Sequence, residues 1–249
     1  MTNFNTATNE QETSVYSTDQ EVQMGAAVAL QVEKELKIID DPIMNERVER
    51  ITQKIADVCD RKDIVYIGKV IEEKEVEGSP IVNAMSLPGG YIYMFKGLME
   101  YIKDDDELAA VIAHEIAHVT ARHSIKRLQA SYASLAVVLA SIPASPALAG
   151  GLNATFQSMF LKYSQEDEIQ ADNLGIKYMK LAGYDAQGMI KMLEALQEYD
   201  RKQPIRPKYY GRTHPYVHER IASANRTITG DLSFRDWVRL TGEREDYKK

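Results

Sequence analysis

The stretch VIAHEIAHVTARH, from Val111 to His123, holds three of the five histidines of the chain. Within it, His114, Glu115 and His118 form the pattern H-E-x-x-H. Residues four apart on an α-helix differ by roughly 40° around the helix axis, so both imidazoles would face one ion from the same side. Glu115 lies beside them, where it can act on a water at the metal instead of binding the metal. The pattern therefore predicts a site for one zinc ion.

The residues around this pattern argue against a charged turn of an ordinary helix. Small and aliphatic side chains cover much of the helix circumference and predict that it is buried; they are Ala109, Ala110, Val111, Ile112, Ile116 and Ala117. A chance H-E-x-x-H is expected in roughly one chain in a hundred of this composition. Buried histidine and glutamate side chains need polar partners, and a metal ion supplies them. Burial therefore favours the metal site.

A catalytic zinc needs a third protein ligand and an open fourth position. His123 follows His114 by nine residues, about half a turn away around a continuous helix, so we predict a surface or packing histidine. The longer pattern H-E-x-x-H-x-x-G-x-x-H is not met either, because the sequence has Ala121 and Ser124 at its last glycine and histidine. The third ligand must come from elsewhere in the chain.

The better candidate lies downstream, in SQEDEIQADNLG (residues 164–175). Glu168 and Asp172 are four residues apart, so one carboxylate can bind zinc while the other accepts a hydrogen bond from a ligand histidine. Ala171 and Gly175 are small and would let this helix approach the first one closely. Acidic residues near a helix start can also serve only as caps. The need for a third ligand favours Glu168.

Composition limits the classes of function. The chain has 249 residues, 44% of them hydrophobic and 27% charged, with a net charge of -7. The negative charge argues against nucleic acid as the main partner. Cys59 is the single cysteine, which excludes an internal disulfide and a cysteine-based zinc cluster. We expect a loose arm over residues 1–17 and a single domain over residues 18–249.

Residue patterns predict an α+β fold, rich in helix, with a small mixed β-sheet beside the H-E-x-x-H helix. A Thr18-x-x-Glu21 capping box predicts the first helix start, and Asp41-Pro42 predicts the second. Further helices are expected from the acidic run at 104–107, over 164–181 and 185–199, and from Pro215 at a first helical position. Short strands are expected at 64–70, near 81–82 and at 91–95.

The segment from 128 to 161 contains no charged residue. Its two prolines and its small residues argue against a single membrane span. We consider three interpretations: an interior hairpin, a lid over the cleft, or a surface that contacts membrane or a protein partner. The position between the two predicted metal-binding helices gives the lid or partner surface equal weight with the hairpin.

Four stretches together resemble peptidase family M48, the gluzincin type of zinc metallopeptidase. They are VNAMSLPGGYIYM (82–94), ELAAVIAHEIAHVTARHS (107–124), EDEIQADNLG (166–175) and THPYVHERI (213–221). The resemblance covers most of residues 19–225 and implies a zincin fold. The zinc ligands that it implies are His114, His118 and Glu168.

The resemblance also implies roles for other residues. Glu115 would be the general base, and Asp172 would hold His114 from behind. His214 matches a histidine that can approach the zinc as a self-blocking fourth ligand, and Arg220 matches an arginine near the active site. We predict that both are catalytic residues, with His214 or Arg220 as the group that stabilises the oxyanion. An edge strand would bind the extended substrate by β-augmentation, and we expect it at Tyr91, Ile92, Tyr93 and Met94.

The leading hypothesis is a zinc endopeptidase that acts on unfolded or damaged proteins, with protein or peptide substrates as its partners. The alternatives are a peptide-binding chaperone with a structural zinc, and a proenzyme silenced by His214 or by the uncharged segment. The polar start shows no signal peptide. By resemblance we expect a protein of the cell envelope or periplasm whose signal is not part of this sequence, with the cytoplasm as the alternative.

Overall fold

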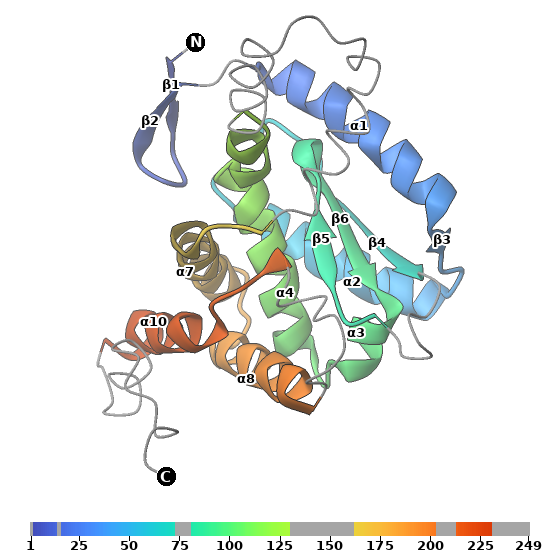
Figure 1. The fold of residues 1–249 in the computed structure, drawn as a ribbon, viewed down its shortest axis with the longest axis vertical. Coiled ribbons are helices and arrows are strands. Elements are labelled where there is room, and N and C mark those ends of the chain that lie inside the picture. The colour runs from blue at the N-terminus through green and yellow to red at the C-terminus, as the bar shows by residue number, and fades with distance from the viewer. Residues whose placement is uncertain (1, 14–15, 73–80, 130–161, 203–212, 231–249) are drawn as a thin grey trace, which may run out of the picture.

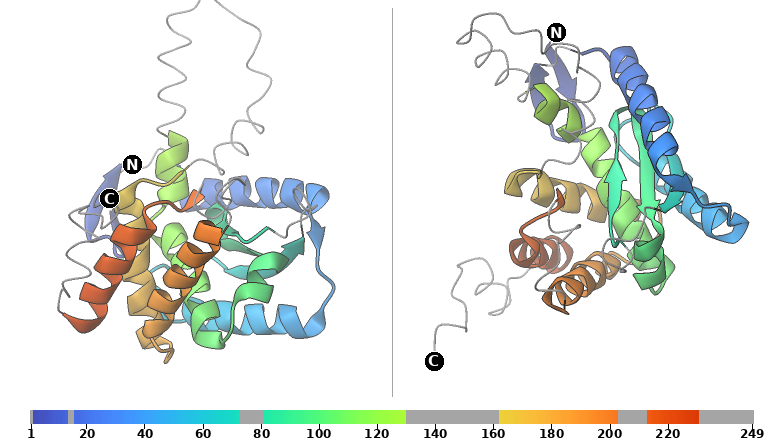
Figure 2. Two further views of the ribbon diagram at one scale, coloured as in Figure 1. Left: turned by 60° about the horizontal axis from the view of Figure 1, so that its bottom comes forward. Right: turned by 45° about the vertical axis from the view of Figure 1, so that its right-hand side comes forward.

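The computed structural model describes residues 2–13, 16–72, 81–129, 162–202 and 213–230. Its central element is helix α4 (Asp105–Thr120), which carries the H-E-x-x-H pattern. On one side of α4 lies a four-stranded mixed sheet, and on the other lie α7 (Gln165–Leu181), α8 (Gln187–Lys202) and α10 (Val217–Thr229) (Figures 1 and 2). The predicted α+β fold is confirmed.

The sheet has the order β3-β4-β6-β5. Its strands are β3 (Lys37–Ile38), β4 (Ile67–Glu72), β5 (Ala84–Ser86) and β6 (Tyr91–Phe95). β4 and β6 run parallel, and β3 and β5 are antiparallel to their neighbours. The prediction that 91–95 forms the edge strand is wrong, because β6 is hydrogen-bonded on both sides. The edge nearest α4 belongs to β5.

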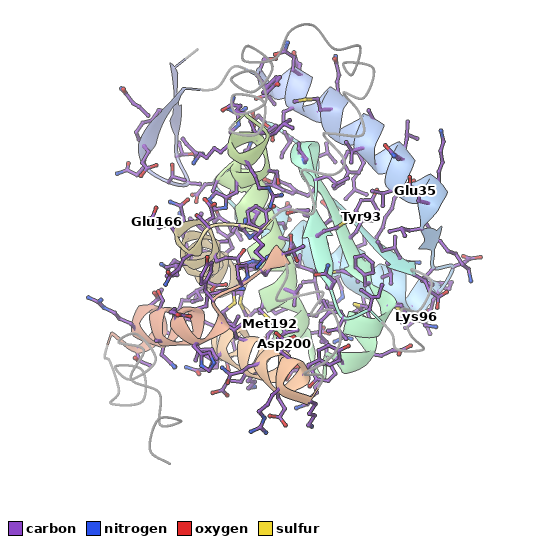
Figure 3. All side chains as sticks on the ribbon, in the orientation of Figure 1. Glu35, Tyr93, Lys96, Glu166, Met192 and Asp200 are labelled. Carbon is purple, nitrogen blue, oxygen red and sulfur yellow. The ribbon has the colours of Figure 1, made fainter. Side chains whose placement is uncertain are left out.

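Side chains of β6 alternate between two layers. Ile92 and Met94 pack into the core shared with α4. Tyr93 packs on the other face, against α1 (Thr18–Glu35), and its hydroxyl donates to Glu33 at 2.8 Å (Figure 3). Ile92, Tyr93 and Met94 are fully buried. These three side chains therefore build the core instead of offering a surface for substrate.

The helices begin within two residues of where local signals place them. α2 (Pro42–Ala56) starts after Asp41, whose side chain accepts from two backbone amides. α1 does start at Thr18, but its capping box joins Ser17 and Gln20, one residue before the predicted pair. α10 begins two residues after Pro215, with Tyr216 at its N-cap in the left-handed region. α8 likewise begins at Gln187, two residues after its predicted start, so each signal was correct in kind and displaced by one or two positions.

The remaining short elements connect these layers. The 3-10 turn η1 (Pro88–Gly90) joins β5 to β6, and α3 (Lys96–Tyr101) joins β6 to α4. Gly89 has φ 76°, and a Cβ on Gly25 would stand 1.8 Å from the Pro88 carbonyl oxygen. Both glycines are needed because α1 crosses this turn in direct backbone contact.

The start of the chain differs from the predicted loose arm. β1 (Thr2–Asn5) and β2 (Glu10–Thr13) form an antiparallel hairpin. The Asn5 side chain donates to the Thr120 carbonyl at 3.2 Å, at the end of α4, and Ala7 packs against the main core. These long-range contacts hold a segment that has no strand periodicity. Most of the uncharged stretch, residues 130–161, lies outside the described residues.

Candidate metal centre

Helix α4 buries a polar site inside an apolar helix. Asp104 caps its N-terminus by accepting from the Glu107 amide at 2.8 Å, and three acidic residues fill its first turn. His114, Glu115 and His118 are 0% exposed. Their neighbours along the helix are buried aliphatic residues that fix the helix between the sheet and α7. The helix is therefore held by its apolar side chains and presents three buried polar ones.

Helix α7 approaches α4 closely enough to complete this site. A Cβ on Gly175 would lie 3.3 Å from the His114 backbone nitrogen, and Ala171 is fully buried in the same interface. The small residues thus act as the sequence predicts. Glu168 and Asp172, one turn apart on α7, are both 0% exposed and face α4.

Four side chains converge on one point. His114, His118, Glu168 and His214 each offer a ligand atom, and these atoms all lie within 4.8 Å of one another. The two Nε2 atoms of His114 and His118 are 3.0 Å apart, and Glu168 Oε1 is 3.4 Å from His118 Nε2. The site thus joins residues from three regions of the chain that are separated by up to a hundred positions.

The donor set fits zinc. Imidazole nitrogen and carboxylate oxygen are its usual ligands, and tetrahedral Zn–N bonds of about 2.0–2.1 Å would separate two nitrogens by roughly 3.3 Å. Asp172 Oδ1 lies 2.9 Å from His114 Nδ1, which therefore carries its hydrogen, so His114 Nε2 points a lone pair into the cluster. Glu115 Oε1 is buried without a hydrogen-bond partner. A bound ion would accept the lone pair of His114 Nε2, and a water on the ion would donate a hydrogen bond to Glu115 Oε1.

Asp172 links the ligands to Arg220, the largest fully buried side chain among the described residues. Arg220 donates to both oxygens of Asp172, at 2.7 and 2.8 Å, and its Nη1 lies 2.6 Å from Glu168 Oε2. The guanidinium is therefore engaged behind the ligands. The sequence predicts Arg220 near the active site, and in the structure Arg220 contacts the Asp172 and Glu168 carboxylates there.

Burial and these charges set the pKa values of the metal-free cluster. Burial raises the pKa of the Glu168 and Asp172 carboxyls, but Arg220 and the neighbouring histidines together outweigh burial, so the pKa of Glu168 lies well below its usual range and that of Asp172 is lowered. Burial and the neighbouring His114 hold the pKa of His118 well below its usual range. Two carboxylates and a neutral imidazole are the forms that bind a metal ion.

Glu115 is held by a residue that the sequence motifs do not single out. Ser86, at the end of β5, donates its hydroxyl to Glu115 Oε2 at 2.7 Å. The other carboxylate oxygen, Oε1, faces His214 Nε2 at 3.4 Å. The register of β5 in the sheet brings Ser86 to Glu115. The residues next to Ser86 in the sequence form no pattern that predicts this contact.

His214 lies inside the cluster, 1% exposed. Its Nδ1 is 3.1 Å from Glu168 Oε1 and 3.3 Å from His114 Nε2. Burial lowers the pKa of this imidazole, but Glu168 and Glu115 outweigh it and raise the pKa above its usual value. The histidine therefore occupies the fourth side of the donor set.

His123 and Tyr163 also belong to this region. α4 ends at Thr120, and Arg122 turns the chain in the left-handed region (φ 57°), so His123 returns to His118 and their Nδ1 atoms are 2.8 Å apart. The predicted opposite-side position is wrong, because it assumed a continuous helix. The Tyr163 ring stacks on His118 with centroids 3.8 Å apart.

Comparisons with known proteins agree with this geometry. The family model described as Peptidase family M48 matches residues 42–228. The beta-barrel assembly-enhancing protease of Escherichia coli (strain K12) is 29% identical over 223 residues, which cover 85% of this chain and 44% of that protein. The mitochondrial metalloendopeptidase OMA1 of Schizosaccharomyces pombe is 30% identical over 208 residues, covering 80% of this chain and 59% of that protein. The chain spans about half the length of these relatives. It belongs to peptidase family M48.

Proposed function

We propose that this member of family M48 is a zinc metalloendopeptidase. The observation that carries the proposal is Glu115, a buried carboxylate with one oxygen bonded to Ser86 and the other without a hydrogen-bond partner, beside a converged His-His-Glu donor set. A structural zinc site needs no such base. This feature favours a hydrolase over a peptide-binding chaperone with a structural zinc.

His114, His118 and Glu168 would hold the ion. When bound, zinc supplies a Lewis acid that lowers the pKa of a water and polarises the scissile carbonyl. Glu115 then takes a proton from the attacking water, whose oxygen forms the new bond to the carbonyl carbon. The same proton passes to the leaving nitrogen as the peptide C–N bond breaks. Arg220 and Asp172 keep His114 and Glu168 in their ligand forms.

Substrate would add to the sheet at β5, a correction of the strand predicted from sequence. Asn83 and Leu87 form backbone hydrogen bonds to β6, so the alternation of an antiparallel pair turns the N–H and C=O groups of Ala84 and Ser86 away from β6. No other strand of the described residues pairs with this edge. An extended peptide bound there would pass beside Glu115.

His214 would keep the enzyme self-blocked. Its imidazole would take the fourth ligand position of the zinc, and its Nε2 lies 3.4 Å from Glu115 Oε1. Displacement of the segment that carries it would open the site. Removing the imidazole with His214→Ala is expected to raise cleavage.

Unfolded or damaged proteins are the proposed substrates, and the cell envelope is the proposed compartment, with the cytoplasm as the alternative. The likeness to a protease named for beta-barrel assembly supports protein substrates and the cell envelope. In the described part of the chain, no helix is long and apolar enough to span a membrane. Fractionation of the source cells, probed with an antibody against the chain, would test the compartment.

The test measures zinc content and cleavage of denatured casein for the wild-type chain and Glu115→Gln. One zinc per chain in both, with cleavage by the wild type alone, supports the peptidase. Zinc in both and cleavage in neither calls for His214→Ala: activity there supports self-blocking, and continued silence favours the chaperone. Absence of zinc from the wild type would overturn the proposal.

A further inference from the structure

A chain of three side chains runs away from the metal centre behind His118. His118 Nδ1 lies 2.8 Å from His123 Nδ1, and His123 Nε2 lies 2.9 Å from Gln170 Oε1. His118 and His123 are 0% and 1% exposed. No motif of the family resemblance gives a role to His123 or to Gln170.

The direction of these hydrogen bonds follows from the acceptors at the far end. His123 Nε2 faces two of them, Gln170 Oε1 and, at 3.4 Å, Asp167 Oδ1. This nitrogen therefore carries the hydrogen of the His123 ring, and Nδ1 of that ring keeps a lone pair. His118 Nδ1 must then donate to it.

The consequence falls on the metal side of His118. Because Nδ1 holds its hydrogen, Nε2 holds the lone pair, and this is the atom 3.0 Å from His114 Nε2 and 3.4 Å from Glu168 Oε1. The opposite tautomer would point an N–H at the ion and leave two lone pairs facing each other between His118 and His123. The order of hydrogen bonds selects the form that can bind metal.

We infer that His123, supported by Gln170, is a positioning residue that sets the tautomer of His118 and so tunes the affinity for the metal. The inference rests on the zinc site of the proposed function but not on peptidase activity. The two ligand histidines then have different supports, since an ionised Asp172 holds His114 and an imidazole holds His118.

The plane of the His118 ring is fixed separately. Tyr163 stacks on it with an interplanar angle of 21°, and the Arg127 guanidinium lies 3.8 Å from the centroid of the Tyr163 ring. The Tyr163 hydroxyl bonds to Ser124 at 2.9 Å. The stack thus fixes the plane of the His118 ring, and the hydrogen bond to His123 determines which His118 nitrogen carries the hydrogen. A change at His123 would alter the tautomer while the stack still holds the ring.

The first test needs no variant. The five histidines of the chain allow each imidazole to be assigned by long-range proton–nitrogen NMR of the zinc-loaded, histidine-labelled protein. The hydrogen is expected on Nε2 of His123 and on Nδ1 of His118. A hydrogen on Nδ1 of His123 would overturn the inference.

The second test compares His123→Leu, which removes the acceptor, with His123→Asn, which can place an amide oxygen near the lost Nδ1. Competition with a chromophoric chelator measures the zinc Kd. The Leu variant is expected to bind zinc about 10–100-fold more weakly, as for other supports of metal-binding histidines, and the Asn variant within about threefold of wild type. Gln170→Met and Gln170→Glu form a second pair with the same order.

His218 provides the matched control, because it makes a surface histidine–glutamine contact with Gln197 at 3.1 Å. His218→Leu is expected to leave the zinc Kd unchanged. Equal zinc affinity in wild type, His123→Leu and Gln170→Met would overturn the inference while leaving the proposed function intact. A wild type that binds no zinc would overturn the proposed function itself.

Discussion

Ser86 donates a hydrogen bond of 2.7 Å to Glu115 Oε2, and this contact joins the edge strand to the H-E-x-x-H helix. It holds one carboxylate oxygen and leaves the other, Oε1, without a hydrogen-bond partner and 3.4 Å from His214 Nε2. The strand that would bind substrate is therefore hydrogen-bonded directly to the residue that would move the proton.

Ser86→Ala is expected to lower kcat about tenfold with little change in KM, because Glu115 loses its orientation but keeps its charge. Steady-state cleavage of a quenched peptide measures both constants. Thr227→Ala, which removes a 2.6 Å hydroxyl contact to Asn173 on the surface, is the control and should match wild type. An unchanged kcat in Ser86→Ala would show that the contact has no catalytic consequence.

Arg220→Leu should destabilise the metal-free protein by about 3–5 kcal/mol, because it leaves the Asp172 and Glu168 carboxylates buried without their cation. Urea unfolding of the metal-free chain measures the free energy. Arg226→Leu, a change of the same kind at an exposed position of α10, should cost less than about 1 kcal/mol. Similar losses in the two variants would contradict the assignment.

Tyr163→Phe and Tyr163→Leu separate the hydroxyl from the ring. The Phe variant loses the bond to Ser124 and should cost about 1 kcal/mol of unfolding free energy, with unchanged zinc affinity. The Leu variant also loses the stack on His118 and should bind zinc more weakly. Chelator competition and urea unfolding measure the two effects. Equal zinc affinity in both variants would mean that the stack does not hold the His118 ring.

Removing the metal should lower the melting temperature, because zinc binds the cluster of ligands in the folded chain and this cluster does not exist in the unfolded chain. At free zinc a thousandfold above its Kd, the stabilisation is about 4 kcal/mol. Calorimetry with and without a chelator measures the shift. In Glu168→Ala, which loses the predicted third ligand, zinc should have a smaller effect. A melting temperature independent of zinc in the wild type would contradict a preformed site.

The metal-free protein should lose stability as the pH falls below about 4, where unfolded carboxyl groups take up protons. The pKa values of Glu168 and Asp172 are lower in the folded than in the unfolded chain, because Arg220 and the neighbouring histidines together outweigh burial. Their stabilisation is thus present above the unfolded pKa and is lost as the pH falls through the folded one. In Glu168→Gln the decline of unfolding free energy between pH 5 and pH 3 should be shallower. An equal decline would mean that Glu168 titrates normally.

Local chemistry in the sequence was sufficient for the helices and for much of the metal centre. Asp41-Pro42, Asp104 and Ser164 start helices because side-chain oxygens satisfy free backbone amides, an interaction within three residues. The i, i+4 spacings of His114 with His118 and of Glu168 with Asp172 follow from one helical turn. The small residues Ala171 and Gly175 predicted the close approach of α7 to α4.

Tertiary structure decided what depends on distant segments. The strand at 91–95 was recognised, but its place inside the sheet depends on pairing with β4 and β5, which no local pattern encodes. His123 was misplaced because the stop after Thr120 has no glycine or proline; Arg122 turns the chain while ion-paired to Glu21 of α1 at 3.1 Å.

The sequence by itself therefore determined the chemistry available to this protein: two imidazoles and a base on one helical face, and a carboxylate pair on another. Only the tertiary structure decided which side chains support them, namely Ser86 for Glu115, His123 for His118, and Arg220 for Asp172. The physical reason is range. Helical spacing fixes neighbours within about one turn, whereas these partners meet through sheet register, a helix end and helix packing.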